Sequence, residues 1–554
     1  MTDLLKLRRF EALSPFEIKD ELIKLAKETT RRTQSPFLNA GRGNPNWIAT
    51  TPRDGYFLLG QFALTESRRV MDNPAGLGGM PQAKGIAARL DAWLSKHADM
   101  PGASFLSAMV AHAVEKFSFE PDAFVHELVD SIIGDNYPVP DRMLAHNERI
   151  VHEYLMWAMC GQPRPPGKFD LFAVEGGTAA MCYIFKTLKA NRLLRPGDTI
   201  ALGTPIFTPY LEMTHLEDYG LKAVHIAAPQ ENHFQFTDDE IKKLEDPKIK
   251  AFFIVNPGNP TGVALSKETI AKITTLVRTK RPDLMLLTDD VYGTFVGDFR
   301  SLLGELPHNT IGVYSYSKYF GCTGWRLGVI AVHEDNIFDK MIAKLPDGHL
   351  NALDTRYGAI TLEPRKLKFI DRLVADSRDV ALNHTAGLSL PQQVMMSMFS
   401  LAEMMDDKKT YQKACMEIVN RRARATLEGL GLADKVKPNP HYDAYYGLID
   451  FEIWARKNVG DDAVEYLKKN VHPLDLAFRL AEDHGIVLLN GGGFDAPEWS
   501  LRVSLANLPD EVYEDIGRGV RSVARSYRDA YEASKATANS SSRSLPATIK
   551  EPAE

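Results

Sequence analysis

A lysine, two serines and an arginine lie close together in the middle of the chain. Lys318 follows the β-prone run Thr310–Tyr316, and Ser315 and Ser317 lie beside it. Arg326 stands eight positions beyond the lysine, after a glycine-punctuated turn. An amine at a strand end can form a Schiff base, and hydroxyls with a guanidinium can hold a phosphate. Most lysines are solvated surface groups, but the apolar and aromatic flanks argue against that here.

The pattern Ser-x-Ser-Lys followed by Gly-x-Arg resembles the segment that carries the pyridoxal-phosphate lysine in the class-I aminotransferase family. Pyridoxal phosphate requires an amine, an acid for its pyridine nitrogen, a donor to its ring hydroxyl, a flat partner for its ring and a phosphate-binding turn. Ligands of parallel α/β sheets bind beyond the carboxyl ends of the strands. We therefore looked for each group at a predicted strand end.

Acidic and amide side chains follow two such strands. Asp289 and Tyr292 lie in Thr288-Asp-Asp-Val-Tyr292, directly after the apolar run Leu284–Leu287. A carboxylate there can keep a pyridine nitrogen protonated, because close opposite charges favour both ionised forms. An Asp-Asp pair after a strand is also typical of a helix N-cap. Asn259, in Asn256-Pro-Gly-Asn-Pro-Thr-Gly262, follows another apolar run and can point its amide at the ring oxygen.

A glycine pair offers a place for a phosphate. Glu175-Gly-Gly-Thr178 joins the predicted strand Leu171–Val174 to a predicted helix. Free N–H groups at a helix start bind phosphate, and the third glycine of a dinucleotide-binding fingerprint is missing. Phe207, in Thr204-Pro-Ile-Phe, can stack on a ring, although a core phenylalanine is an almost equal alternative.

The order of the predicted elements indicates an α/β fold. Seven short β-prone runs alternate with helical segments between residues 168 and 335, which predicts a mostly parallel seven-stranded sheet sandwiched by helices. Residues 395–535 mix helices with a few strands and predict a smaller α+β domain. The expected domains are an N-terminal arm with part of the small domain (1–55), a helical insertion (56–133), a large cofactor-binding domain (134–394), a C-terminal small domain (395–535) and a disordered tail (536–554).

Composition excludes several classes of function. The 554 residues carry a net charge of −6, which gives no electrostatic footprint for nucleic acid or an anionic membrane. No apolar run reaches membrane-spanning length, and the N-terminus lacks the apolar core of a signal peptide. The four cysteines are scattered without a C-x-x-C pair, so neither a structural metal site nor a disulfide framework is expected. A cytoplasmic protein fits best.

The motifs appear in the order of the class-I aminotransferase family, and the sequence resembles a fold-type-I pyridoxal-phosphate enzyme over about residues 36–510. The resemblance implies that Lys318 binds the aldehyde of pyridoxal 5'-phosphate. Asp289 would pair with the pyridine nitrogen, and Tyr292 and Asn259 would bind the ring oxygen. The implied phosphate ligands are Gly176, Gly177, Thr178, Ser315, Ser317, Arg326 and, from a neighbouring subunit, Tyr137.

The resemblance also implies substrate contacts. Arg502, in Ser500-Leu-Arg-Val-Ser504, would clamp the α-carboxylate with a bidentate fork, and Gly43 would lie beside it. A surface arginine on a strand is the alternative. Several stretches, including Leu13–Lys19, Ala40–Trp47 and Gly134–Met143, resemble the aspartate β-decarboxylases within this family. That similarity implies conversion of L-aspartate to L-alanine and CO2, with a side transaminase activity after which a 2-oxo acid such as pyruvate restores the enzyme. It implies a homodimer or a larger assembly such as a dodecamer.

One departure bears on the reaction. Aspartate aminotransferases typically bind the distal carboxylate with an arginine in the segment that matches His384–Ser389, where this chain has none. A tight ion pair would oppose departure of that carboxylate as neutral CO2. We expect Arg42 or Lys19 to make looser contacts instead. A plain aspartate or aromatic amino-acid aminotransferase is the nearest alternative. A regulator with a ligand-sensing domain would need a basic helix-turn-helix, which neither end of the chain has.

Overall fold

The structure is a computed structural model that describes residues 4–11, 13–378, 387–432 and 439–542. The chain forms two compact units: a larger unit of Gly43–Ile418 with Asn439–Tyr445, and a smaller unit of Met1–Arg42, Val419–Pro438 and Tyr446–Glu554. Within the described residues, no helix is long and apolar enough to cross a bilayer. The same residues hold no cluster of three or more His, Cys, Asp or Glu side chains suited to a metal ion. All four cysteines are free thiols.

The larger unit is built on a seven-stranded sheet, as the sequence predicts. The strands are β2 (Phe169–Val174), β3 (Thr199–Thr204), β4 (Lys222–Ala227), β5 (Ile249–Val255), β6 (Met285–Asp289), β7 (Thr310–Ser315) and β8 (Gly328–His333), in the order β2-β8-β7-β6-β5-β3-β4. Neighbouring strands from β7 to β4 are parallel, whereas β8 is antiparallel to both β2 and β7. The mostly parallel α/β sheet is confirmed.

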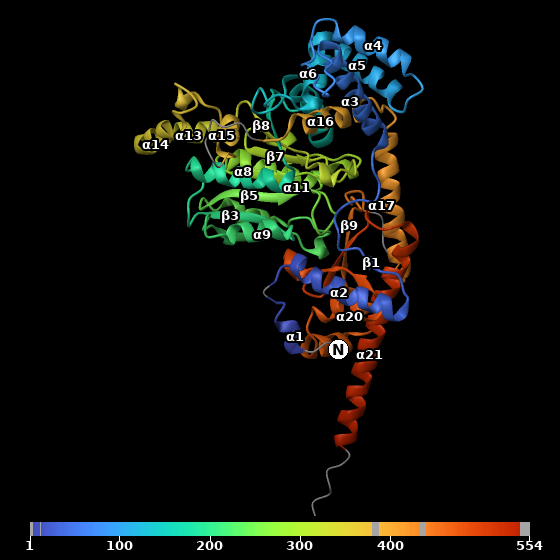
Figure 1. The fold of residues 1–554 in the computed structure, drawn as a ribbon. Coiled ribbons are helices and arrows are strands. Elements are labelled where there is room, and N and C mark those ends of the chain that lie inside the picture. Colours follow the sequence, from blue (N-terminus) through green and yellow to red (C-terminus); the bar gives the residue numbers. More distant parts are fainter. Residues whose placement is uncertain (1–3, 12, 379–386, 433–438, 543–554) are drawn as a thin grey trace, which may run out of the picture. The chain divides into compact units, whose positions relative to one another are not determined.

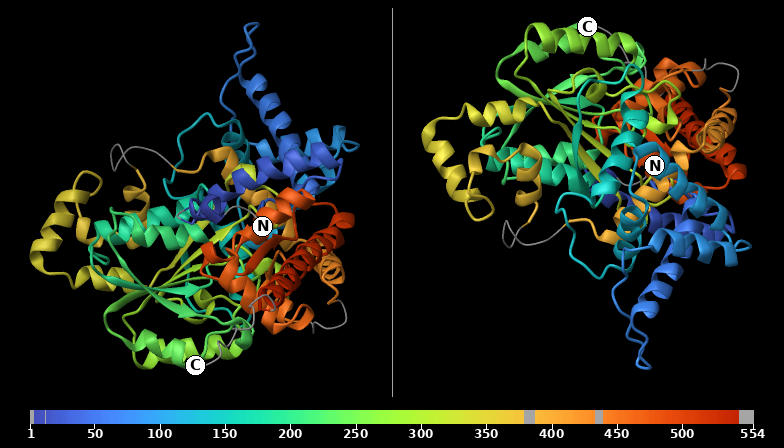
Figure 2. Two further views of the ribbon diagram at one scale, coloured as in Figure 1. Left: turned by 90° about the horizontal axis from the view of Figure 1, so that it is seen from below. Right: turned by 90° about the horizontal axis from the view of Figure 1, so that it is seen from above.

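Helices cover both faces of this sheet (Figures 1 and 2). Successive strand residues point to opposite faces, so the apolar strands feed two separate cores. On one face, Phe253 and Leu287 pack with residues of α8 (Gly177–Ala190) and α15 (Phe369–Asp376). On the other, their neighbours in the strands pack with α11 (Lys267–Thr279). The two cores fix the edge of the sheet where β5, β6 and β7 end.

The larger unit contains further helices before and around the sheet. The expected helical insertion (56–133) contains α4, α5 and α6, which lie with α3 and α16 in Figure 1. Glu120 accepts hydrogen bonds from the N–H groups of Asp122 and Ala123 and so caps α6. The helices are α3 (Thr50–Val70), α4 (Ile86–Lys96), α5 (Ala103–Phe117), α6 (Pro121–Ile133), α7 (Ala145–Leu155), α9 (Thr208–His215), α10 (Asp238–Lys242), α12 (Leu302–Glu305), α13 (Ile337–Ala343), α14 (Asp347–Tyr357) and α16 (Leu390–Met404), with α17 (Thr410–Gly429) shared between the units.

The smaller unit combines short strands with amphipathic helices. Its three-stranded sheet has the order β11-β12-β9, and β1 pairs with β10. The helix α2 starts at Pro15 and packs on α20. The elements are β1 (Leu38–Asn39), β9 (Tyr446–Asp450), β10 (Ile486–Val487), β11 (Leu489–Asn490), β12 (Ser500–Ser504), α1 (Leu4–Arg8), α2 (Pro15–Thr33), α18 (Phe451–Asn458), α19 (Asp461–Asn470), α20 (Asp475–His484) and α21 (Tyr513–Ser542).

Several expected boundaries differ from the structure. Residues 43–55 and 439–445, expected in the N-terminal arm and the small domain, belong to the larger unit. Residues 395–418 belong to the larger unit rather than the smaller one, because α16 packs against α3, α6 and α7. The helix α21 continues to Ser542, so the expectation of a disordered tail is wrong for residues 536–542. The rest of that tail lies outside the described residues.

Candidate functional site

The amine of Lys318 lies on the turn that follows β7. This side chain is partly buried, and its Nζ donates a hydrogen bond of 3.0 Å to the carbonyl oxygen of Gly43. The same oxygen accepts a hydrogen bond of 2.8 Å from the hydroxyl of Tyr445. Gly43, Lys318 and Tyr445 come from three distant parts of the sequence, and all belong to the larger unit. The fold therefore holds the amine in one direction and limits its contact with water.

Asp289 ends β6, the strand next to β7, and its carboxylate is buried. One oxygen, Oδ2, accepts a hydrogen bond of 2.6 Å from the hydroxyl of Tyr210, and Oδ1 accepts one of 3.2 Å from the N–H of Val291. Burial raises the pKa of this carboxyl above its ordinary value, while these two donors and the charge of Lys318 oppose the rise. A cation placed beside Asp289 would favour its ionised form.

The neighbouring Asp290 faces different partners. Its carboxylate accepts a hydrogen bond of 2.7 Å from the hydroxyl of Thr288 and another from Ser301, and the side chain is fully buried. Burial raises its pKa to about 8, so this carboxyl is mostly neutral at pH 7. Of the two aspartates, Asp289 is thus the one beside Lys318 and Tyr210, and Asp290 braces the loop after β6.

The N-terminus of α8 lies beside Asp289. A Cβ atom built on Gly177 would stand 3.7 Å from Asp289 Oδ2 and 4.0 Å from the Cβ of Ser315. The first turn of α8, which includes the exposed Thr178, therefore starts at the edge of the sheet that carries the acid and the serines. Unpaired N–H groups at the start of a 14-residue helix favour a bound anion.

A guanidinium lies against this helix start. Arg326 donates hydrogen bonds of 3.2 Å to the carbonyl of Glu175 and 3.0 Å to that of Thr323. It has a left-handed backbone with φ 54° and an exposed side chain. A Cβ on Gly176, where φ is 89°, would overlap the guanidinium. Glycine at this position therefore allows a fixed cation to approach the N-terminus of α8.

Two serine hydroxyls complete this region. The hydroxyl of Ser315 lies 2.9 Å from that of Ser317 and 3.2 Å from the carbonyl oxygen of Leu327, and both serines are buried. Their hydroxyls can rotate toward a ligand because each carries one donor and two acceptor lone pairs. The structure thus brings together Gly176, Gly177, Thr178, Ser315, Ser317 and Arg326 around one helix start.

The three remaining ring contacts expected from the sequence lie in the same unit. Tyr292 is buried, and its ring centroid is 5.1 Å from that of Tyr445. Asn259 is buried in the turn after β5. Phe207 is partly buried against the core, and its ring meets that of Tyr210 edge-on at 5.2 Å. Both interpretations of Phe207, as a ring-stacking residue and as a core residue, remain compatible with this position.

Arg502 lies on β12 in the smaller unit and is buried, with 1% of its surface exposed. The alternative of a surface arginine is therefore wrong. Its Nη2 donates a hydrogen bond of 3.1 Å to the carbonyl oxygen of Gly41, and its guanidinium lies 4.3 Å from the ring centroid of Tyr446. Phe16 lies on another side of this guanidinium at 5.8 Å, and Lys19 Nζ lies 5.7 Å from the same phenyl ring.

Arg42 is the last residue of the N-terminal segment of the smaller unit, and its side chain is exposed, whereas that of Lys19 is partly buried. The structure brings Lys19 close to Arg502 through their shared neighbour Phe16. The segment His384–Ala386, where the sequence lacks an arginine, lies outside the described residues.

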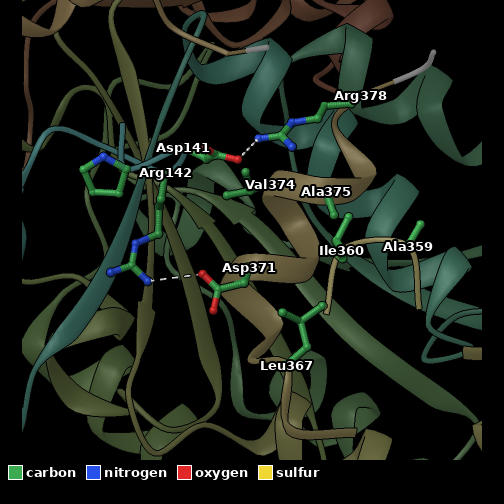
Figure 3. Close-up of a pocket in the computed structure, with 10 residues that line it drawn as sticks. Asp141, Arg142, Ala359, Ile360, Leu367, Asp371, Val374, Ala375 and Arg378 are labelled. Carbon is green, nitrogen blue, oxygen red and sulfur yellow. Dashed lines mark hydrogen bonds and ion pairs between the residues drawn. The ribbon is translucent and has the colours of Figure 1, made fainter. Parts of the chain in front are cut away.

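Tyr137 is 75% exposed, on the loop between α6 and α7. Further along this loop, Asp141 pairs with Arg378 at 2.6 Å, and Arg142 pairs with Asp371 at 3.5 Å. Figure 3 shows both pairs on the wall of a cavity of about 530 Å³ between the loop and α15. The ion pairs anchor the loop and leave Tyr137 projecting from it.

Sequence reasoning missed two residues of the site. Tyr210 stands three positions after Phe207, and a tyrosine in the first turn of a helix after a strand could have indicated a donor to the buried acid. Tyr445 has no local signal, because its partner Gly43 lies 402 positions away. Only the folded chain brings that pair together.

Similarity to known proteins agrees with this arrangement. The family model "Aminotransferase class I and II" matches residues 174–518. A Pseudomonas protein named bifunctional aspartate aminotransferase and L-aspartate beta-decarboxylase is 47% identical over 527 residues, which cover 95% of this chain and 98% of that protein. The aromatic-amino-acid aminotransferase 2 of Thermococcus litoralis is 35% identical over 155 residues, covering 27% of this chain and 38% of that one.

Solved structures agree on the fold. A double mutant of Thermus thermophilus aspartate aminotransferase superposes with a TM-score of 0.58 at 18% identity, covering 94% of this chain and 98% of the other. An aromatic aminotransferase from Pyrococcus horikoshii gives a TM-score of 0.55 at 17% identity, covering 88% and 96%. The family match spans more than half of the chain, and the Pseudomonas relative spans nearly all of it. The chain therefore belongs to the class I and II aminotransferase family.

Proposed function

We propose that this protein removes the β-carboxylate of L-aspartate as CO2 to give L-alanine, and that it transaminates aspartate as a side reaction. The observation that carries the proposal is the meeting of Lys318, Asp289 and the Arg326-flanked start of α8 at one edge of the sheet. The choice of substrate and reaction is supported by the Pseudomonas relative, which matches nearly the whole chain.

The residues at this edge fit pyridoxal 5'-phosphate. The N–H groups at the start of α8, with Arg326, offer charge-assisted donors to a phosphate. Asp289 offers a buried carboxylate for a cationic ring nitrogen, and Tyr210 holds that carboxylate in place. Gly176 and Gly177 leave the helix start clear of side chains. Tyr292 and Asn259 would bind the ring oxygen, and Phe207 would lie against the ring.

When bound, pyridoxal phosphate supplies an aldehyde that condenses with amines and a protonated ring that accepts the electron pair released at the substrate. Lys318 would hold the cofactor until the aspartate amine displaces it, would then take the α-proton as general base, and would return a proton to Cα before alanine leaves. The Cα–Cβ framework is kept, the bond from Cβ to the carboxylate breaks, and a proton replaces CO2 at Cβ. Asp289 would keep the ring nitrogen protonated.

Recognition of the two carboxylates falls to other residues. We assign the α-carboxylate to Arg502, whose planar fork suits bidentate binding, with Gly43 beside it. Lys19 and Arg42 would make looser contacts with the β-carboxylate. A weak contact suits a group that must leave as neutral CO2, because a strong ion pair stabilises the ground state. If Arg42→Gln changes neither the KM for aspartate nor the ratio of alanine to oxaloacetate, Arg42 has no such role.

The assembly and setting complete the proposal. Tyr137 would reach the phosphate in a neighbouring subunit, so the active form would be at least a homodimer and could extend to a dodecamer. Its exposure of 75% in a single chain supports this, since a tyrosine is ordinarily more buried. A 2-oxo acid such as pyruvate would restore enzyme that has transaminated. We expect the protein to act in the cytoplasm.

A plain aspartate or aromatic amino-acid aminotransferase is the second candidate, because shorter aminotransferases match part of the chain. Purified protein with pyridoxal phosphate and aspartate, but without a 2-oxo acid, separates the two. The decarboxylase releases CO2 and alanine in equal amounts over many turnovers. A plain aminotransferase stops after one turnover per site and releases no CO2 beyond background, and that result would reject the proposal.

A further inference from the structure

Three consecutive carbonyl groups directly after Lys318 accept hydrogen bonds from distant parts of the larger unit. They belong to Tyr319, Phe320 and Gly321. A buried carbonyl without a partner is costly, so a turn with this many polar groups needs donors from elsewhere. The donors come from the segment before α3, from α3 itself and from α17.

Three side chains, those of Trp47, Tyr411 and Arg53, supply these donors. The indole N–H of Trp47 and the hydroxyl of Tyr411 both donate to the Tyr319 carbonyl, at 3.1 Å and 2.8 Å. The guanidinium of Arg53 spans the next two carbonyls: Nη1 donates to Phe320 at 3.1 Å and Nη2 donates to Gly321 at 2.8 Å. One rigid fork therefore holds two successive peptide groups.

The turn has little room to move sideways. Gly321 has φ 58°, and a Cβ there would overlap the carbonyl of Trp47. The guanidinium of Arg53 also lies 5.1 Å from the ring centroid of Phe399, which stacks on Phe320 at 4.6 Å. The segment before α3 thus packs directly on the backbone that carries the lysine. In addition, the hydroxyl of Tyr319 donates a hydrogen bond of 3.0 Å to the carboxylate of Glu403.

We propose that Arg53 is a positioning residue that fixes the backbone after Lys318 and so aims the lysine amine. The proposal rests on the proposed function in taking Lys318 as the reacting amine. Its geometric core is the pair of hydrogen bonds from one guanidinium to the carbonyls of Phe320 and Gly321. Tyr411 has a smaller share of the same task, since it holds the Tyr319 carbonyl.

Arginine suits this role for a physical reason. Its planar fork presents two parallel N–H groups in fixed geometry, whereas a lysine ammonium is a point charge that can reach one carbonyl at a time. Releasing one of the two carbonyls would let the turn relax and would weaken the bond from Lys318 Nζ to Gly43. A displacement of about 1 Å at a reacting group can lower the rate about 100-fold.

The test compares Arg53→Lys and Arg53→Gln with Arg69→Lys as a matched control. Arg69 lies on the same helix and pairs with Glu66, away from the turn. The first readout uses cofactor-free protein: an amine-reactive reagent labels it briefly, and mass spectrometry gives the labelling rate of Lys318 relative to the other lysines. We expect both Arg53 variants to label Lys318 roughly 2- to 10-fold faster, the range for loss of one hydrogen bond. The control should match the wild type.

The second readout separates kcat from KM in cofactor-loaded protein. We expect kcat to fall about 10- to 100-fold in the Arg53 variants while KM stays within about threefold, because orientation of the amine matters mainly after binding. Circular dichroism and thermal unfolding verify that the variants are folded. Should both Arg53 variants fail to fold, Tyr411→Phe removes a single donor and should accelerate labelling about twofold.

Folded Arg53 variants with wild-type labelling of Lys318 and wild-type kcat would overturn the proposal. If the Arg53 variants do not fold, unchanged labelling in Tyr411→Phe would overturn it instead. Labelling needs neither cofactor nor aspartate. If the wild type releases no CO2 but the Arg53 variants expose Lys318, the proposed function fails and the positioning role stands. If the wild type decarboxylates and Arg53→Lys behaves like it, only the positioning role fails.

Discussion

Two adjacent aspartates in this protein are both buried, but their carboxyl groups have different partners. Asp289 accepts from Tyr210 and faces Lys318, whereas Asp290 accepts from Thr288 and Ser301 on the other side of the loop. The sequence named Asp289 as the first candidate from its place after a strand. It could not show Tyr210 as the donor, because that contact joins residues 79 positions apart.

Replacement of these aspartates should give unequal results. Asp289→Asn removes the charge that would pair with the ring nitrogen. Loss of one partner from a buried ion pair costs ~3 kcal/mol, so we expect kcat/KM to fall at least about 100-fold. Asp290→Asn replaces a carboxyl that is mostly neutral at pH 7 with a group of the same shape. Its kcat/KM should stay within about threefold. Steady-state kinetics at pH 7 measure both, and equal losses in the two variants would contradict the assignment.

A buried glutamate should make stability depend on pH. Burial raises the pKa of Glu403 from 4.5 to about 7, so the folded protein keeps this proton over a range where the unfolded chain has lost it. Stability is therefore greatest below about pH 4.5 for this group and falls as the pH rises through about 7. The loss should reach up to ~3 kcal/mol.

Glu403→Gln removes that titration and keeps an oxygen for the hydroxyl of Tyr319. Denaturant unfolding at pH 5 and pH 7.5 should show a smaller change in the variant than in the wild type. An identical pH dependence in both proteins would show that Glu403 ionises normally in the fold.

At the scale of elements, the start of α8 is the feature on which the proposed phosphate binding depends. The helix follows β2 through Gly176 and Gly177, and Arg326 lies against this junction. Short β-prone runs between helical segments predicted all seven strands of the sheet, because strands covered by helices on both faces are rich in apolar, β-prone residues. The end of α21 was not predictable in the same way, because residues 536–542 are small and mostly polar and carry no periodic apolar face.

Two glycines with the same positive φ allow a controlled test of this junction. Gly176 and Gly197 both have φ 89°, but a Cβ would overlap Arg326 at Gly176 and would meet nothing within 4 Å at Gly197. Alanine at either position should cost about 1–3 kcal/mol of stability from backbone strain. Only Gly176→Ala should also weaken pyridoxal-phosphate affinity, by about 10- to 100-fold, through displacement of the guanidinium. Fluorescence titration gives both affinities, and an equal loss would argue against a phosphate site here.

At the scale of the whole molecule, the chain consists of two units whose boundaries the sequence placed only approximately. Residues 395–418 read as the start of the small domain, yet α16 packs with helices of the larger unit. Such packing is set by tertiary contacts that composition does not reveal. The resemblance to the family predicts that Tyr137 reaches the site of a neighbouring subunit, and this side chain is exposed in the single chain.

A mixing experiment tests whether Tyr137 serves a neighbouring subunit. Lys318→Ala and Tyr137→Ala proteins, each weakly active alone, are combined and allowed to exchange subunits. If Tyr137 completes the neighbour's site, each mixed dimer has one site with both residues intact, and random exchange should restore about a quarter of wild-type activity. If Tyr137 acts within its own chain, no mixed dimer has such a site. Activity equal to the sum of the two variants would then refute the shared site.

The central claim is that the amine of Lys318 binds the aldehyde of pyridoxal phosphate. Borohydride reduction of the loaded protein, followed by digestion and mass spectrometry, measures this directly. We predict that one reduced cofactor per chain is attached to Lys318 and that the protein loses its visible absorbance on reduction. A protein that stays colourless with excess cofactor, or a label on any other lysine with none at position 318, would contradict the account.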